Sequence, residues 1–307
     1  MLHVLRPLLP FALLVVCSVL LAGKIMIAQA AVSSGLQPFQ LAILGNAGAA
    51  LVLLFVARAV GQTVSWERRH LLLYLVLGLV SFAVPNIVTY MIVDPVGPAY
   101  VSSLYALSPV LTMTLAALVG LEGLTPRRTM DILLGLVGMV ALIGQKVAGI
   151  DLSATVWVLL GLTVPVAAAA GNVIRTAFWP GGASPLSFAT ATLLVSSALL
   201  AIVGPLIESP STWTLGGDGQ AFWLAVLIAA SALSFVLNYT FQKVAGPVVF
   251  SQIGYWGTAF GVVLAAFLFG DVLAAGSLVG VAAIVAGGLL ANRRSDPGAP
   301  AATAVSR

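Results

Sequence analysis

The sequence predicts an all-α membrane protein with ten transmembrane helices, built as two inverted five-helix repeats. Its 307 residues are 61% hydrophobic and only 7% charged. The mean hydropathy of +1.13 lies well above that of soluble domains. The apolar residues form continuous runs of the roughly 20 residues that a membrane helix needs, and not the short alternating segments of a β-barrel. The third observation is an internal repeat.

One segment of the chain recurs 149 positions later without a gap. The first copy carries Tyr90, Gly97, Pro98, Ser102, Leu115, Ala116, Ala117, Glu122 and Gly138, and the second carries Tyr239, Gly246, Pro247, Ser251, Leu264, Ala265, Ala266, Asp271 and Gly287. A looser match pairs Gly23-Lys24 with Gly171-Asn172, and Gln37-Pro38 with Ser184-Pro185. Shared Gly-Pro, Tyr and acidic positions indicate two copies of a unit of roughly 150 residues.

The apolar runs give the expected spans in order. Breaking the chain at charge, Gly and Pro clusters yields 8–31, 38–58, 70–93, 97–120, 128–146, 154–178, 185–207, 220–243, 247–270 and 273–292. Each copy holds an odd number of spans, so the second copy must be inverted relative to the first, as in many transporters. We expect one repeat in residues 1–150, a second in 151–292, and a disordered cytoplasmic tail in 293–307.

Charge predicts the orientation of these spans. With the N-terminus in the cytoplasm, the inner side carries Arg6, Arg58, Arg68, Arg69, Arg127, Arg128, Lys243, Arg293, Arg294 and Arg307. The outer side carries Lys146 and the acidic Asp94, Asp151, Glu208, Asp218 and Asp271. This positive-inside pattern predicts a multi-pass protein of a bacterial-type inner membrane with both termini cytoplasmic. The dispersed Arg pairs form no basic stripe, so we expect no nucleic-acid partner.

Other classes of function find little support in the sequence. Arg6 and Ala28-Gln29-Ala30 could belong to a cleaved signal peptide, but Lys24 interrupts the apolar run and the second copy has an uncleavable counterpart at 154–178. Cys17 is the sole cysteine, and His3 and His70 lie far apart, so no disulfide or metal site is expected. No phosphate loop or nucleophile elbow is present, and we expect no cofactor and no enzymatic activity.

The repeated segment resembles a known family. Gly97-Pro98-Ala99-Tyr100-Val101-Ser102-Ser103-Leu104-Tyr105-Ala106-Leu107-Ser108-Pro109-Val110, then Gly120-Leu121-Glu122 and Gly135-Leu136-Val137-Gly138, is similar to the EamA-type repeat of the drug/metabolite transporter superfamily. The second copy matches through Gly246-Pro247, Gly270-Asp271 and Gly287-Gly288, with Thr258 in place of Pro109. The resemblance covers about residues 8–292. It implies a ten-span secondary transporter, often an exporter of amino acids and other small metabolites.

Lys24 is the most unusual residue of the chain, because a lysine within an apolar span is costly and is by default a functional-site candidate. It could hold a carboxylate or another anionic group of a substrate. Alternatively it could snorkel to the outer interface, which lies about seven residues or roughly 10 Å away. Every acidic residue lies at a span end or in a loop, so Lys24 is the only obvious titrating side chain for proton coupling; otherwise the protein is a facilitator.

Polar and aromatic residues on several spans complete the candidate site. Asn172 replaces Lys24 in the second copy, and Arg175, one turn further, is interpreted as the inner-membrane anchor of the sixth span. The candidate substrate-binding residues are Lys24, Asn86, Tyr90, Tyr105, Asn172, Asn238, Tyr239, Gln252, Tyr255 and Trp256. They could line a wet pocket for a small zwitterion, or they could form hydrogen bonds between packed helices.

The sequence thus predicts alternating access around a cavity between the two copies, with a small-molecule substrate and membrane lipids as partners and a monomer or homodimer as the assembly. A small-solute channel would need rings of polar residues along a pore, and the scattered polar set argues against it. An intramembrane enzyme would need convergent catalytic side chains, which the sequence lacks. A non-transporting membrane scaffold remains open, as do the substrate, the direction and the coupling ion.

Overall fold

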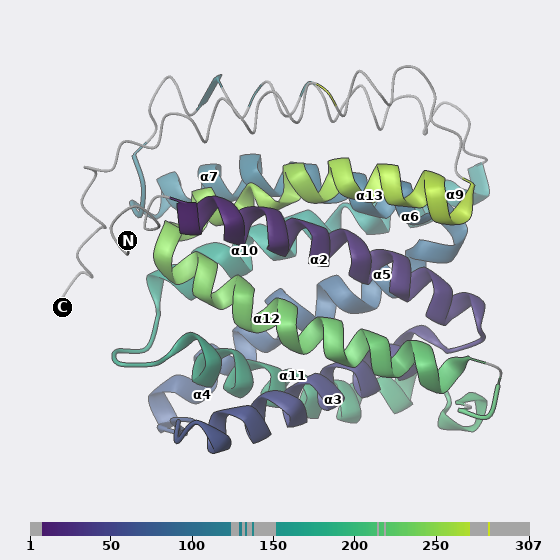
Figure 1. Cartoon of the computed structure of the whole chain (residues 1–307), viewed down its shortest axis with the longest axis horizontal. Coiled ribbons are helices and arrows are strands. Elements are labelled where there is room, and N and C mark those ends of the chain that lie inside the picture. The colour runs from purple at the N-terminus through teal and green to yellow at the C-terminus, as the bar shows by residue number, and fades with distance from the viewer. Residues whose placement is uncertain are drawn as a thin grey trace.

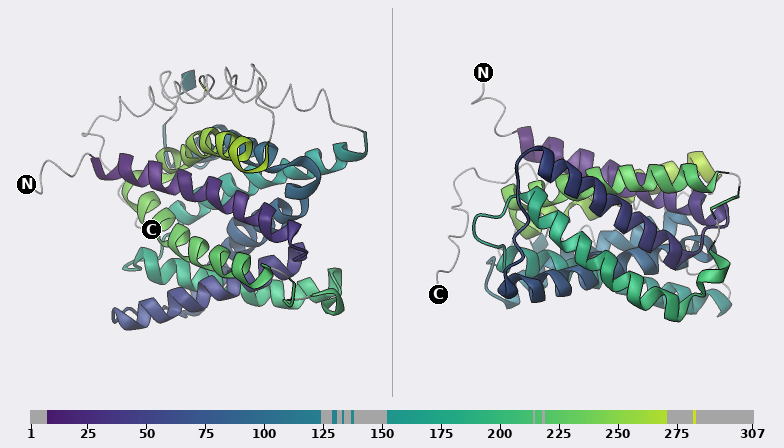
Figure 2. Two further views of the ribbon diagram at one scale, coloured as in Figure 1. Left: turned by 45° about the vertical axis from the view of Figure 1, so that its right-hand side comes forward. Right: turned by 90° about the horizontal axis from the view of Figure 1, so that it is seen from below.

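The computed structural model describes residues 8–123, 152–213, 215–217 and 219–270, together with positions 129, 130, 133, 137 and 282. Within these residues the fold is entirely helical, without a strand. The helices lie side by side in one bundle, with α2 between α12 and α13 (Figures 1 and 2). The predicted all-α class is confirmed for the described part of the chain.

The first half supplies four spans. They are α2 (Leu8–Ser33), α3 (Pro38–Ala59), a third span made of α4 (Arg68–Leu77), the π-helix η1 (Gly78–Ala83) and α5 (Val84–Val96), and a fourth made of α6 (Pro98–Leu104), the 3-10 turn η2 (Tyr105–Leu107) and α7 (Ser108–Leu118). These agree with the first four predicted spans. The fifth predicted span, 128–146, lies almost wholly outside the described residues.

The second half supplies the rest. Its helices are α9 (Leu152–Gly161) and α10 (Thr163–Ala177), α11 (Pro185–Ile207), the short η3 (Pro210–Thr212), α12 (Gln220–Ser251) and α13 (Ile253–Phe269). Seven helices of the described chain are long and apolar enough to cross a membrane, and α13 is shorter because residues 247–251 continue α12. The tenth predicted span, 273–292, lies outside the described residues except for position 282.

Glycine and proline set the boundaries at equivalent points of the two halves. Gly97, with φ 81° and ψ 153°, starts α6 directly before Pro98. Gly246, with φ 78° and ψ 174°, interrupts α12 directly before Pro247. Positive φ is accessible to glycine without steric cost, and proline is favoured in the first helical turn because its missing N–H is not needed there. The repeat therefore preserves a backbone geometry as well as residue types.

Two prolines account for the irregular turns in the first half. Pro85 has no N–H to donate to the Ser81 carbonyl four residues earlier, and the π-helix η1 contains Ser81. Pro109 likewise has no N–H to donate to the Tyr105 carbonyl, and η2 begins at Tyr105. Local widening or tightening of a helix commonly accommodates such a break. The equivalents of these prolines, Ser234 and Thr258, lie within the regular helices α12 and α13.

The helices of the two halves pack in matched pairs. Helix α2 contacts α12 and α13, and its counterpart α10 contacts α5, η1 and α7. Helix α12 contacts α3, and the matching contact joins α11 to α4 and η1. The equivalent helices α3 and α11 pack on each other, and the contact of α6 with α13 is matched by the contact of α7 with the end of α12. Exchanging the halves thus leaves the packing scheme of the described helices unchanged.

Helices α3 and α11 are also joined at both ends. The Glu208 carboxylate, at the end of α11, accepts hydrogen bonds from the Phe39 and Gln40 backbone N–H groups at 3.2 and 3.1 Å and from the Trp213 indole at 2.6 Å. At the other end, Gln62 accepts a hydrogen bond from Ser184, the residue that caps α11. Each helix start therefore meets the other helix end, so α3 and α11 run antiparallel.

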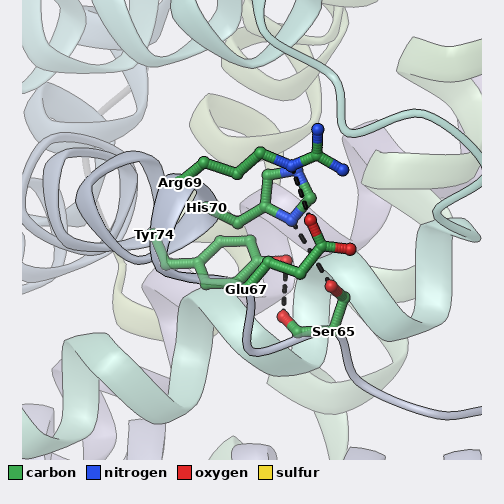
Figure 3. A network of polar contacts seen from close by, with 5 residues as sticks. All are labelled: Ser65, Glu67, Arg69, His70 and Tyr74. Carbon is green, nitrogen blue, oxygen red and sulfur yellow. Dashed lines mark hydrogen bonds and ion pairs between the residues drawn. The ribbon is translucent and has the colours of Figure 1, made fainter.

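The turn before α4 forms a separate polar network (Figure 3). Tyr74 donates to the Ser65 carbonyl at 3.1 Å, and the Ser65 hydroxyl lies 3.4 Å from Nδ1 of His70. Arg69 forms an exposed ion pair with Glu67 at 2.5 Å. These contacts hold the turn that leads into the third span, and they give His70 a partner within the same turn.

Candidate functional site

A cavity of about 120 Å³ lies where the two halves meet. Its lining comes from α2, η1 and α5, η2 and α7 in the first half, and from α10, α12 and α13 in the second. Drug-sized ligand pockets are typically about 300–1,000 Å³, so this one suits a small molecule. No Asp or Glu of the described chain lines it.

Lys24 lines this cavity. Its ammonium lies 4.3 Å from the centre of the Phe235 ring of α12, on the opposite half of the molecule. Aromatic rings attract cations through the negative face of the π system. No hydrogen bond or ion pair joins Lys24 to the residues that the structure describes. The side chain is thus turned into the bundle and leaves its ammonium available within the cavity.

Arg175 is the second cation of the cavity, and its interpretation as a membrane-edge anchor is wrong. The residue is only 5% exposed, because α10 turns it inward against α12. Its Nη2 donates to Asn172 Oδ1 at 3.2 Å, and the guanidinium lies 4.5 Å from the centre of the Tyr239 ring and 5.5 Å from that of Phe250. A snorkelling anchor would reach water instead.

Amide side chains join the cavity to the surrounding helices. The Asn172 side chain, which accepts from Arg175, also donates to Thr112 of α7 at 3.3 Å, and the Asn172 backbone carbonyl accepts from the Gln242 side chain at 2.6 Å. Asn86 donates to Asn46 of α3 at 2.9 Å. These contacts agree with the interhelical interpretation of the polar set. Asn86 and Asn172 therefore line the cavity and also join neighbouring helices.

Three polar atoms at the cavity have no partner among the described residues. They are Ser81 Oγ, Asn238 Oδ1 and Arg175 Nε. Buried polar atoms without a partner are uncommon and costly in native proteins. Each atom belongs to a residue that lines the cavity, on η1, α12 and α10 respectively.

The structure divides the predicted site residues into two groups. Lys24, Asn86, Tyr105, Asn172 and Asn238 line the cavity, and Tyr239 lies behind it under the Arg175 guanidinium. The others do not line it: Tyr90, Gln252, Tyr255 and Trp256. Tyr90 packs in the core near Ala28 and Ala83, and Trp256 packs edge-on against Phe11 with ring centres 6.3 Å apart.

Sequence reasoning missed part of the lining. Besides Arg175, the missed residues are Leu21, Ser81, Phe82, Pro85, Ser108, Ala168, Ser234, Phe235, Phe250, Ser251, Ile253 and Gly254. One signal was available: Pro85 directly precedes Asn86, an asparagine already selected. The phenylalanines gave none, because aromatic residues are as frequent in lipid-facing and core positions.

Residues 9–144 match the model of the EamA-like transporter family. This part of the chain is similar to an EamA-like unit. The resemblance stated for Gly97–Gly138 is thereby confirmed. No curated protein matches the chain. Sixteen chains of solved structures match, among them one described only as "Crystal structure of protein", with TM-score 0.70, 18% sequence identity, and coverage of 91% of this chain and 95% of that chain. At this identity the likeness concerns the fold alone.

Proposed function

We propose that the chain is a secondary transporter that moves a small metabolite across a membrane by alternating access. The observation that carries this proposal is the polar, cationic cavity at the junction of the two halves. Alternating access requires a site that both halves share, so that rocking of one against the other exposes it to either side. The EamA-like unit in residues 9–144 supports the same conclusion.

The proposed architecture is a ten-span inverted repeat with units at 1–150 and 151–292. The matched packing of helices, the shared backbone geometry at Gly97 and Gly246, and the antiparallel pair α3 and α11 support it. An experimental structure should relate spans one to five to spans six to ten by a twofold axis in the membrane plane. An axis along the membrane normal would contradict the proposal.

The proposed orientation has both termini in the cytoplasm of a cell with an inner membrane, because the basic residues gather at that side. Cysteine labelling in intact cells tests it, since the chain has a single native cysteine, Cys17, which is buried. With Cys17→Ala as background, Gln62→Cys should resist an impermeant reagent added from outside. Strong labelling at position 62 would refute the orientation.

The proposed direction is export, and the substrates are small metabolites such as amino acids that carry an anionic group held by Lys24. Loss of one charge-assisted contact costs about 1.5–3 kcal/mol, roughly ten- to a hundredfold in affinity. Transport by purified protein in liposomes should therefore fall by that factor in Lys24→Gln. The matched control is Lys243→Gln, because Lys243 lies exposed over Trp179 at the end of the eighth span.

The same assay separates this proposal from its alternatives. A channel-type facilitator would pass solute only down its gradient, and unlabelled substrate on the far side would not drive uptake of labelled substrate. A non-transporting scaffold would give liposomes no flux above the empty control for any solute tested. Either result would overturn the proposed carrier mechanism.

A further inference from the structure

We propose that Lys24 and Arg175 act together, and that the cavity binds a small organic molecule bearing two separate anionic groups, on the scale of a four-carbon dicarboxylate. The inference rests on the proposed function for the role of the cavity in transport. It deepens that function by assigning Arg175 to the site and by naming the substrate class.

The first step is the imbalance of charge. Two cations line the cavity, and no carboxylate of the described chain faces them. Two acidic residues of the described chain have other partners: Asp94 accepts from Gln29 at 3.2 Å, and Glu208 caps α3. A cation over an aromatic ring recovers only part of the cost of removing the charge from water. The cavity therefore lacks negative charge, which a bound anion would supply.

The second step is the available donor geometry. Arg175 is 5% exposed, and its Nε has no partner, so part of the guanidinium fork is unused. Arginine binds carboxylates through two parallel N–H groups, and such pairs are strong and directional. Lys24 offers its ammonium without a hydrogen bond to the described residues. The two sites can thus each accept one anionic group.

The third step is the spacing between the cations. Lys24 lies over Phe235 and Arg175 over Tyr239, which are one helical turn apart on α12. The Cβ atoms of residues at this spacing on a helix are about 5–6 Å apart. The Phe82 ring stands against both, with centres 4.7 Å from Phe235 and 6.3 Å from Tyr239. Each cation therefore stands over a different ring of one aromatic cluster, and this arrangement suits a ligand that carries two carboxylates on a short hydrocarbon linker.

Binding to the detergent-solubilised full-length protein tests the inference with succinate, its monoamide succinamate, its diamide succinamide, and ethyl phosphate. Succinamate keeps the length of succinate but loses one charge. We expect succinate to bind roughly ten- to a hundredfold more tightly than succinamate, and succinamide to bind more weakly still. Ethyl phosphate, with both charges on one group, should bind more weakly than succinate. Equal affinities for succinate and succinamate would overturn the inference, as would tighter binding of ethyl phosphate.

Variants at the two cations sharpen the test. Lys24→Gln and Arg175→Gln should each lower the affinity for succinate by the same ten- to hundredfold and remove its advantage over succinamate. Arg175→Lys should retain part of that advantage. Arg69→Gln and Lys243→Gln, which remove cations that do not line the cavity, should change neither value. An unchanged preference in Arg175→Gln would exclude Arg175 from the site.

Thermal unfolding without ligand distinguishes a binding role from a structural one. Arg175 carries a buried charge without an acidic partner, so Arg175→Gln should leave the melting temperature unchanged or raise it. A clear fall would indicate a structural clamp and overturn the assignment. Failure of the proposed function gives a different pattern, because succinate would still bind with its preference while liposomes showed no flux.

Discussion

The third and fourth spans of the first half, residues 68–118, differ from their counterparts at 220–269 in how they line the cavity. Equivalent positions face it from both sides: Pro85 and Ser234, Asn86 and Phe235, Tyr105 and Gly254. The packing scheme is shared, yet none of these pairs keeps its residue type. The repeat thus preserves the framework of the cavity, while the chemistry of the lining differs between the halves.

The backbone shows the same contrast. The first half bends around its prolines through a π-helix and a 3-10 turn, whereas the second keeps α-helical geometry at the matching positions. At one of them Thr258 donates to the carbonyls of Gly254 and Ser102, both at 2.8 Å. The Thr258 hydroxyl therefore joins α13 to α6. Its counterpart in the first half, Pro109, interrupts the fourth span instead. The asymmetry is local and can be altered by single substitutions.

The largest effect on stability should come from the close crossing of these two spans. A Cβ at Gly254 would meet the backbone carbonyl of Tyr105, which cannot move as a side-chain tip can. Gly254→Ala should therefore destabilise the protein by about 1–3 kcal/mol, measured as unfolding in detergent.

Gly23→Ala is the matched control, because nothing lies within 4 Å of a Cβ at that helical position. It should be neutral or stabilising by about 0.5–1 kcal/mol. Equal effects of the two alanine substitutions would mean that the two spans do not cross at Gly254.

A smaller effect is expected at the junction of α3 and α11. Glu208→Gln weakens the acceptor that two backbone N–H groups and the Trp213 indole share, and loss of a helix cap costs about 0.5–2 kcal/mol. Glu67→Gln breaks only the exposed ion pair with Arg69, which should contribute about 0–1 kcal/mol. The difference between the melting temperatures of these two variants measures how much the Glu208 carboxylate stabilises the start of α3. Equal melting temperatures would show that it does not stabilise this helix.

The smallest effect on stability, with a distinct effect on function, is expected from Pro85→Ser. This substitution copies the residue of the second half and restores an N–H for the Ser81 carbonyl. The melting temperature should stay level or rise, while substrate affinity falls because Ser81, Phe82 and Asn86 shift in the lining. Unchanged affinity together with a regular helix would show that the π-helix does not shape the site.

The sequence predicted the framework more completely than the lining. Long apolar runs and Gly-Pro boundaries anticipated the eight spans of the described residues, because hydropathy and backbone conformation are local properties. Lys24 and Asn172 could be selected because polar groups within apolar spans are costly. Arg175 could not be placed, because a cation near a span end fits both a membrane anchor and a buried ligand. Which face of α10 meets α12 is decided by packing across the whole bundle.

The central claim is that one cavity, shared by both halves, opens to each side of the membrane in turn. Ser108 lines the cavity, so Cys17→Ala/Ser108→Cys places a single thiol there. An impermeant maleimide, applied in separate experiments to each face of the membrane, should label this thiol from both sides. Gln62→Cys and Ser211→Cys, near opposite ends of the α3–α11 pair, should each react from one side only. Labelling of position 108 from a single side, with both controls behaving as expected, would contradict the account.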